Sequence, residues 1–308
     1  MTISTDHSAE ARLHEALGRW ADAHRGRYQG MSVLEYDPDT YPYQRLDEFT
    51  TAAGAVADAE TFAGLRPALR AGYLDAMGSR GAAALEALAG GAVVGEIGSL
   101  LAAGKSVAVL ATHADGLDDV GIYSGGLALS FADSSLVRRN ATILNKVMSR
   151  EAYKGVPIAD LFSSFATVYW VIPESEQATR LGVAREAAAY VNTKALRALV
   201  SDMRTGIAVT MAPTGTAMQV ETDDDGGITA VRVPPLGDST VGLMCKFAAY
   251  VVAGLWEERA ALGPLTFVPD LGTGAGRVER QRGAVRGDVT RTMVELTESL
   301  ADVPVTAA

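Results

Sequence analysis

The chain has 308 residues, of which 48% are hydrophobic, so it can bury a sizeable core and is not expected to be disordered. Its formal net charge of −10 argues against a dedicated nucleic-acid binder, because such proteins need a positive face for the phosphates. The single cysteine, Cys245, excludes an internal disulfide and a cysteine-based metal cluster within one chain.

The sequence contains no segment that is expected to cross a membrane. Its longest apolar stretches, residues 92–104 and 241–256, are interrupted by Glu96 and Lys246 and are shorter than a bilayer span requires. The N-terminus is polar and lacks the pattern of a secretory signal. We therefore expect a cytoplasmic protein without integral membrane association.

The N-terminal third of the chain is predicted to be helical. Leu13, Leu17 and Trp20 recur at the spacing of an amphipathic helix. Three further segments are rich in Ala, Leu, Met and Glu, and they are residues 47–60, 60–77 and 80–103. These patterns predict a helical N-terminal region over residues 1–90 and a second region, the core, over residues 91–308.

Beyond residue 104 the pattern changes to short, continuous apolar runs, which are typical of buried strands. The predicted strands are residues 107–111, 167–172, 207–211, 218–222, 228–233 and 265–268. Between them, an apolar stripe over residues 181–204 predicts a long helix. This alternation favours an α/β fold, with a mixed, largely parallel sheet flanked by helices.

His113 is the first titratable residue after the predicted strand at residues 107–111, and Asp118 follows five positions later. Catalytic groups in open α/β sheets gather at the carboxyl ends of strands, so His113 lies where chemistry is expected. A carboxylate bonded to one imidazole nitrogen leaves the other nitrogen to accept a proton. The alternative is a structural histidine, because an acid at this spacing is common by chance in an acidic chain.

Two motifs in this order resemble those of a known family. The run from His113 to Asp118 has the form His-x4-Asp, and the predicted strand at residues 207–211 leads into Pro213-Thr214-Gly215-Thr216. Over roughly residues 90–270 the chain resembles the glycerolipid acyltransferases, the family that contains glycerol-3-phosphate and lysophosphatidate acyltransferases. A helical part before an α/β core is similar to the soluble, plastid-type glycerol-3-phosphate acyltransferase.

The resemblance implies direct attack of an acceptor on an acyl thioester, without an acyl-enzyme. His113 would be the general base and Asp118 would orient it. Thr214, Gly215 and Thr216 would then be the oxyanion- and substrate-binding residues, through backbone N–H groups or a hydroxyl. An ordinary turn is the alternative interpretation of the second motif.

The sequence departs from the family pattern where the family binds phosphate. Thr214 stands where the family has Glu, Ala217 stands where Arg often follows, and the strand that ends near Pro173 lacks an Asp-Arg pair. Because a bidentate Arg cannot be replaced by Ala or Pro, glycerol 3-phosphate is not predicted as the acceptor. Compensating cations are available, with a solvated helix face as the alternative. They are Lys146, Arg150, Lys154 and Arg180.

The sequence thus predicts an acyltransferase of a specialised pathway, which needs no cofactor and no metal. The acyl donor would be an acyl-CoA or acyl carrier protein, and a small-molecule acceptor would supply a hydroxyl or an amine. Two alternatives stay open. The arginine-rich segment at residues 277–291 could support an aminoacyl-tRNA as donor, or the chain could be a degenerate, non-catalytic member that binds lipid or a partner.

Overall fold

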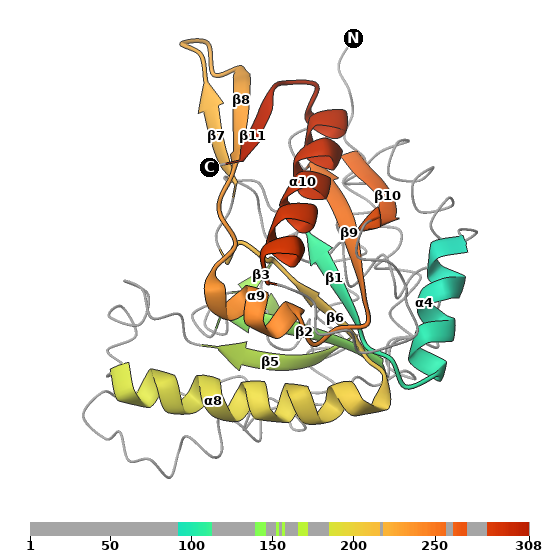
Figure 1. Ribbon diagram of the computed structural model, residues 1–308. Helices are drawn as coiled ribbons and strands as arrows, with labels where there is room; N and C mark the ends of the chain where they lie inside the picture. The colour runs from blue at the N-terminus through green and yellow to red at the C-terminus, as the bar shows by residue number, and fades with distance from the viewer. Residues whose placement is uncertain are drawn as a thin grey trace. The chain divides into compact units, whose positions relative to one another are not determined.

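The computed structural model describes residues 92–112, 139–145, 152–153, 156–157, 166–171, 185–215, 218–256, 261–269 and 282–307. Its helices and strands are labelled in Figure 1. The chain divides into two compact units. The first unit comprises Met1–Asp75 and Ser134–Asp202, and the second comprises Ala76–Asp133 and Met203–Ala308. The predicted boundary near residue 90 lies just before the first described residue, so it stays a prediction.

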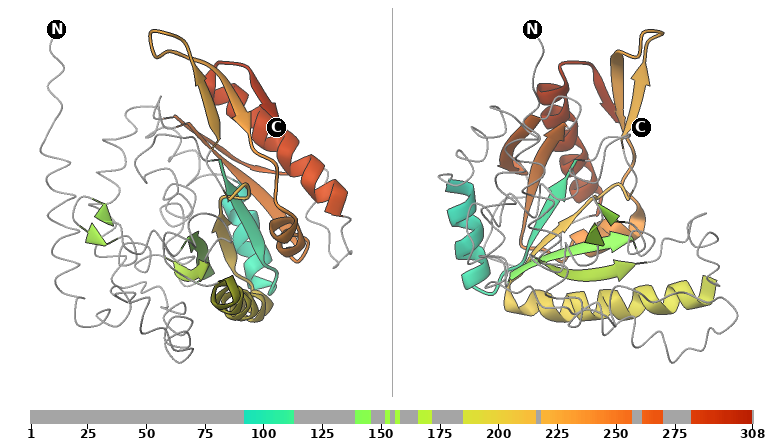
Figure 2. Two further views of the ribbon diagram at one scale, coloured as in Figure 1. Left: turned by 90° about the vertical axis from the view of Figure 1, so that its left-hand side faces the viewer. Right: turned by 180° about the vertical axis from the view of Figure 1, so that it is seen from behind.

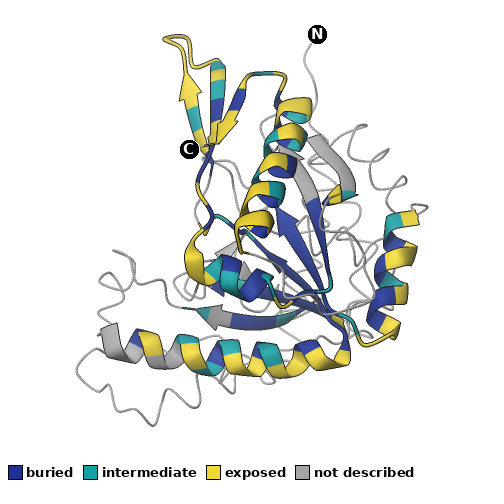
Figure 3. Ribbon diagram, viewed as in Figure 1, coloured by how far each residue is buried: buried dark blue, intermediate teal, exposed yellow. Residues whose placement is uncertain are grey.

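The second unit contains four strands of the main sheet. They are β1 (Val107–Ala111), β6 (Ala208–Met211), β9 (Ala249–Trp256) and β10 (Ala261–Phe267). β1 pairs in parallel with β6 and with β9, and β10 runs antiparallel to β9. Every residue of β1 and β6 is buried (Figure 3). Both strands are apolar apart from Thr210 of β6, because the two faces of a parallel sheet are covered.

Three helices belong to the same unit. They are α4 (Ala92–Ala102), α9 (Asp238–Met244) and α10 (Arg282–Ala301). α10 runs alongside β9 and also contacts α9 (Figure 2). Its buried side chains include Val285, Val289 and Met293, which recur every four residues and form one stripe along the helix. This stripe explains why α10 lies against the sheet, although the helix has many polar residues.

α10 also contacts a small three-stranded sheet of order β11-β8-β7. Its strands are β7 (Gln219–Thr222), β8 (Ile228–Val233) and β11 (Val305–Ala307). β8 is antiparallel to β7 and parallel to β11. In the turn between β7 and β8, the Oδ1 atom of Asp223 accepts hydrogen bonds from the N–H groups of Asp225 (3.1 Å) and Gly227 (2.6 Å). The two strands that were predicted here are confirmed.

The amino ends of β1, β6 and β9 are joined by hydrogen bonds around Ser106. This buried side chain donates to the carbonyl of Met203 (2.8 Å) and accepts from the N–H of Ile207 (2.9 Å). The carbonyl of Ser106 accepts from the N–H of Ala248 (2.9 Å). Backbone groups therefore satisfy one another at this edge of the sheet, as buried polar groups must.

At this amino edge, the backbone at Gly206 packs directly against the backbone of Leu101 and Gly104. The φ of Gly206 is 78°, in the left-handed region, which glycine adopts without steric cost. A Cβ atom at this position would lie 3.0 Å from the Cα of Gly104 and would overlap the carbonyl oxygen of Leu101. The amino edge is thus filled by main chain, which favours the opposite, carboxyl edge as the place where a ligand binds.

The first unit contributes β2 (Asn140–Asn145) and β5 (Thr167–Val171), which pair in parallel. β3 (Ala152–Tyr153) and β4 (Val156–Pro157) form a separate antiparallel pair. α8 (Arg185–Asp202) contacts β5 and is followed by a short 3-10 helix, Met203–Thr205. The helix predicted at residues 181–204 is confirmed over the part that the structure describes.

Tyr169 links β5 to α8 within the first unit. Its side chain is buried, and its hydroxyl donates a hydrogen bond to the carboxylate of Asp202, at the end of the helix. Burial raises the pKa of the Tyr169 hydroxyl well above its ordinary value, and the hydrogen bond to Asp202 raises it further. Tyr169 therefore remains protonated and fixes the end of α8.

In the second unit the strands of the main sheet have the order β10-β9-β1-β6, and in the first unit β2 pairs with β5. An α/β fold with a mixed, mostly parallel sheet is confirmed. Among the helices predicted before residue 104, the structure describes only α4, which falls within the helix predicted at residues 80–103. The other predicted N-terminal helices lie outside the described residues.

Candidate functional site

The carboxyl ends of β1 and β6 lie side by side. The register pairs Leu110 of β1 with Met211, the last residue of β6. In the sequence, His113 follows Leu110 by three positions, and Thr214 follows Met211 by three positions. The segments that carry the two predicted motifs therefore begin at neighbouring strand ends, on the edge where α/β enzymes bind ligands.

Residues 212–215 form a tight turn directly after β6. The N–H of Gly215 donates to the carbonyl of Ala212 (3.1 Å), which closes a four-residue turn with Pro213 at its second position. Thr214 does not have a positive φ, so the turn is of type I, in which Pro at this position is favoured. Gly215 follows with φ 69°. The sequence therefore explains the turn, which holds Thr214 at a fixed place directly after the end of β6.

The hydrogen bond within this turn reduces the number of donors in residues 214–216 that could stabilise an oxyanion. Gly215 is exposed, but its N–H is used in the hydrogen bond to Ala212. If residues 214–216 stabilise an oxyanion, the donors would have to come from Thr214 and Thr216. Thr214 is partly exposed, whereas Thr216 lies outside the described residues.

The catalytic pair itself falls outside the described residues. The structure describes the chain to Thr112, which is fully buried, and His113 is the next residue. Asp118 and the four candidate anion-binding residues also lie outside the described part. The latter are Lys146, Arg150, Lys154 and Arg180. Asn145 ends β2, so the cationic segment after it begins at the end of a strand.

Sequence analysis missed one polar residue near this edge. Thr210 lies one position before the end of β6; it is only 2% exposed. Its hydroxyl oxygen is buried and has no hydrogen-bond partner among the residues that the structure describes. The only signal for it in the sequence was a hydroxyl residue inside the apolar run at residues 207–211.

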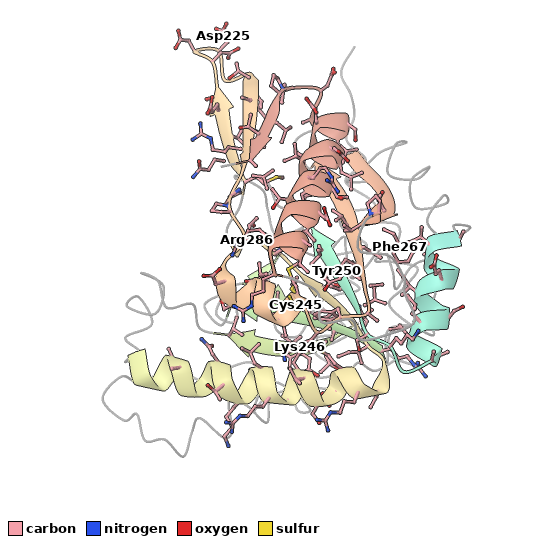
Figure 4. All side chains as sticks on the ribbon, viewed as in Figure 1. Asp225, Cys245, Lys246, Tyr250, Phe267 and Arg286 are labelled. Carbon is pink, nitrogen blue, oxygen red and sulfur yellow. The ribbon has the colours of Figure 1, made fainter. Side chains whose placement is uncertain are left out.

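The described part of the arginine-rich segment is the start of α10. Arg286 forms an ion pair with Asp238 of α9 (Figure 4), and Arg291 pairs with Asp288 at 2.9 Å. Arg286, Asp238 and Arg291 are largely exposed and Asp288 is partly exposed, so the pairs contribute little to stability. They nevertheless place carboxylates beside two of the arginines that were considered for binding a polyanion, which weakens that interpretation.

Cys245 and Lys246 are further reactive side chains in the described part of the chain. Cys245 caps the C-terminal end of α9, is partly exposed, and is followed by the exposed Lys246 (Figure 4). Within the described ranges, no group of three or more His, Cys, Asp or Glu side chains is arranged to hold a metal ion. Among the helices of that same part of the chain, none combines the length and apolar character needed to cross a membrane.

Comparison with known proteins adds no family. No protein-family model matches the chain, and no curated protein matches it.

Proposed function

We propose that the protein is an acyltransferase that moves an acyl group from a thioester carrier to the hydroxyl or amine of a small acceptor. The observation that supports this most is the parallel pairing of β1 with β6. These buried strands end side by side, and the His-x4-Asp and Pro-x-Gly-Thr segments follow them at equal distances in the sequence. One substrate carbonyl at this edge would be within reach of both segments.

In the proposed reaction, His113 removes the proton from the acceptor hydroxyl or amine. The acceptor oxygen or nitrogen then attacks the carbonyl carbon of the thioester and forms a tetrahedral intermediate. When this intermediate collapses, the carbon–sulfur bond breaks and the proton passes from His113 to the leaving thiolate. Asp118 would hold the imidazole in the tautomer that accepts the proton.

The turn after β6 supports a role for residue 214 in this reaction. The hydrogen bond from Gly215 to Ala212 fixes the turn that holds Thr214 directly after β6, the strand that pairs with β1. A preorganised donor at this place would stabilise the negative charge on the carbonyl oxygen in the tetrahedral intermediate.

For the acceptor, we propose a small molecule without a phosphate group. The sequence lacks the arginines with which the resembled family is taken to hold phosphate. An aminoacyl-tRNA donor is the weaker alternative, since Arg286 and Arg291 are paired with carboxylates. We therefore favour a small carrier such as coenzyme A, or acyl carrier protein, as the donor.

A mass-spectrometric transfer assay tests this proposal. The purified protein is incubated with acyl-CoA, acyl carrier protein or aminoacyl-tRNA donors and a pool of hydroxyl and amine acceptors. We expect an acylated acceptor from the wild type and from a His24→Ala control, and none from His113→Ala. Failure of every donor with the wild type, or equal product from His113→Ala, would leave the non-catalytic binding protein as the better account.

A further inference from the structure

The hydroxyl of Thr210 is a buried polar group that makes no hydrogen bond within the described part of the chain. Leaving such a group without a partner is unfavourable, whereas valine has the same shape and would avoid the cost. Folded proteins retain few unsatisfied groups of this kind, and a bound water, ion or ligand commonly completes their hydrogen bonding. Thr210 is therefore a candidate for contact with a bound molecule.

The strand register gives the surroundings of Thr210. Its cross-strand partner on β1 is Val109, which in turn pairs with Val251 of β9. Cross-strand partners share one face of a sheet, so Thr210 lies on a face with two fully buried valines. Tyr250 lies on the other face, where its hydroxyl donates to the carbonyl of Met244 in α9 (Figure 4). The hydroxyl of Thr210 is thus beside aliphatic side chains that cannot accept its proton.

Thr210 is also close to the proposed reaction site. It precedes Met211, the last residue of β6, by one residue, and a strand rises about 3.3 Å per residue, so Thr210 lies about 3 Å along the strand from its carboxyl end. An acyl group whose carbonyl lay at the carboxyl edge of β1 and β6 would span this separation within the first few carbon atoms of its chain. A hydroxyl among aliphatic side chains matches the chemistry of an acyl group that carries an oxygen atom near its carbonyl.

We propose that Thr210 is a substrate-binding residue, whose hydroxyl forms a hydrogen bond with an oxygen atom of the acyl group that is transferred. This inference rests on the proposed acyltransferase function and extends it to the class of substrate, an oxygen-bearing acyl chain. Thr292 of α10 is a comparable threonine with a structural role. It is also buried, but its hydroxyl donates to the carbonyl of Asp288 (2.9 Å).

The test compares Thr210→Val, Thr210→Ser and Thr292→Val in the full chain. Each protein is melted without ligand, and KM and kcat are measured with palmitoyl-CoA and 3-hydroxypalmitoyl-CoA as donors. We expect Thr210→Val to raise the melting temperature by about 2 °C, because an unsatisfied hydroxyl is removed. The same variant should lose about 3- to 10-fold in kcat/KM for the hydroxylated donor, and Thr210→Ser should retain it. Thr292→Val should lower the melting temperature and leave KM unchanged.

Two results would overturn the inference. A Thr210→Val protein with unchanged KM for both donors would show that the hydroxyl does not touch substrate. A lower melting temperature for this variant would show that the hydroxyl is already hydrogen-bonded in the free protein. If His113→Ala is inactive in either case, the proposed acyltransferase function stands and only the role of Thr210 is refuted. If the wild type transfers neither donor nor any donor of the wider panel, both proposals fail together.

Discussion

Replacement of Gly206 by alanine tests the close packing at the amino edge of the main sheet. Alanine would have to adopt the left-handed conformation of φ 78°, which costs a non-glycine residue about 1–2 kcal/mol. Its Cβ would also meet the backbone of Gly104 at 3.0 Å and the Leu101 carbonyl oxygen at a still shorter distance. Because backbone atoms cannot rotate away, the chain must shift, and such overpacking costs about 1–3 kcal/mol. We expect Gly206→Ala to lower the free energy of unfolding by about 2–5 kcal/mol.

Gly226→Ala is the matched control for this prediction. Gly226 has φ 80°, but no heavy atom lies within 4 Å of the position of its Cβ. This variant should therefore lose only the conformational contribution, about 1–2 kcal/mol. Urea unfolding followed by far-UV circular dichroism measures both variants against the wild type. If Gly206→Ala is destabilised no more than Gly226→Ala, the close approach to Leu101 and Gly104 does not exist in solution.

Other predictions concern buried hydrogen bonds. Ser106→Ala should destabilise the protein by about 2–4 kcal/mol, since it leaves two buried backbone groups without their partner. The control is Ser99→Ala at an exposed position, which should change stability by less than about 0.5 kcal/mol in the same urea titration. Tyr169→Phe should lose about 1 kcal/mol at neutral pH, because its hydrogen bond to Asp202 is removed. The pKa of Tyr169 is raised by folding, so its contribution is complete below pH 10, the ordinary tyrosine value, and declines at higher pH. Unfolding measured across this range should show a steeper loss of stability for the wild type than for Tyr169→Phe, and equal slopes would contradict the buried hydroxyl.

The strands that sequence analysis predicted best are those in which both faces are buried. β1 has the predicted bounds, and β6 begins one residue later than predicted. In both, every side chain is covered, so the apolar run in the sequence has the length of the strand. The hairpin of β7 and β8 was also predictable, because the Asp- and Gly-rich turn between the strands is local chemistry.

Elements that depend on packing were missed. The apolar stretch at residues 241–256 contains the end of α9 and all of β9, and periodicity cannot separate a buried helix end from a buried strand. α10 was missed because its buried stripe includes Thr292 and Thr297, which count as polar in a sequence. The hydroxyl of Thr297 lies 3.7 Å from the sulfur of Met218, a contact that no sequence pattern indicates.

For the candidate site, the sequence predicted which strand ends carry chemistry, and the register of β1 and β6 agrees with the idea of one shared edge. It did not reveal that the N–H of Gly215 is used within its own turn, since this depends on the turn type. It also gave no weight to Thr210, because the burial of a single hydroxyl is a property of the folded sheet. The position of the His113 side chain stays a prediction.

The most direct test of the proposed function is the kinetic effect of replacing His113 with the donor and acceptor that the mass-spectrometric assay identifies. A general base contributes about 10²- to 10⁴-fold to the rate, so His113→Ala should lower kcat/KM by this factor. The circular dichroism spectrum and the unfolding midpoint should stay those of the wild type. Asp118→Asn should cause a smaller loss, because it disturbs the orientation of the base without removing it. A His113→Ala protein that keeps its fold and transfers the acyl group at about the wild-type rate would contradict the proposal.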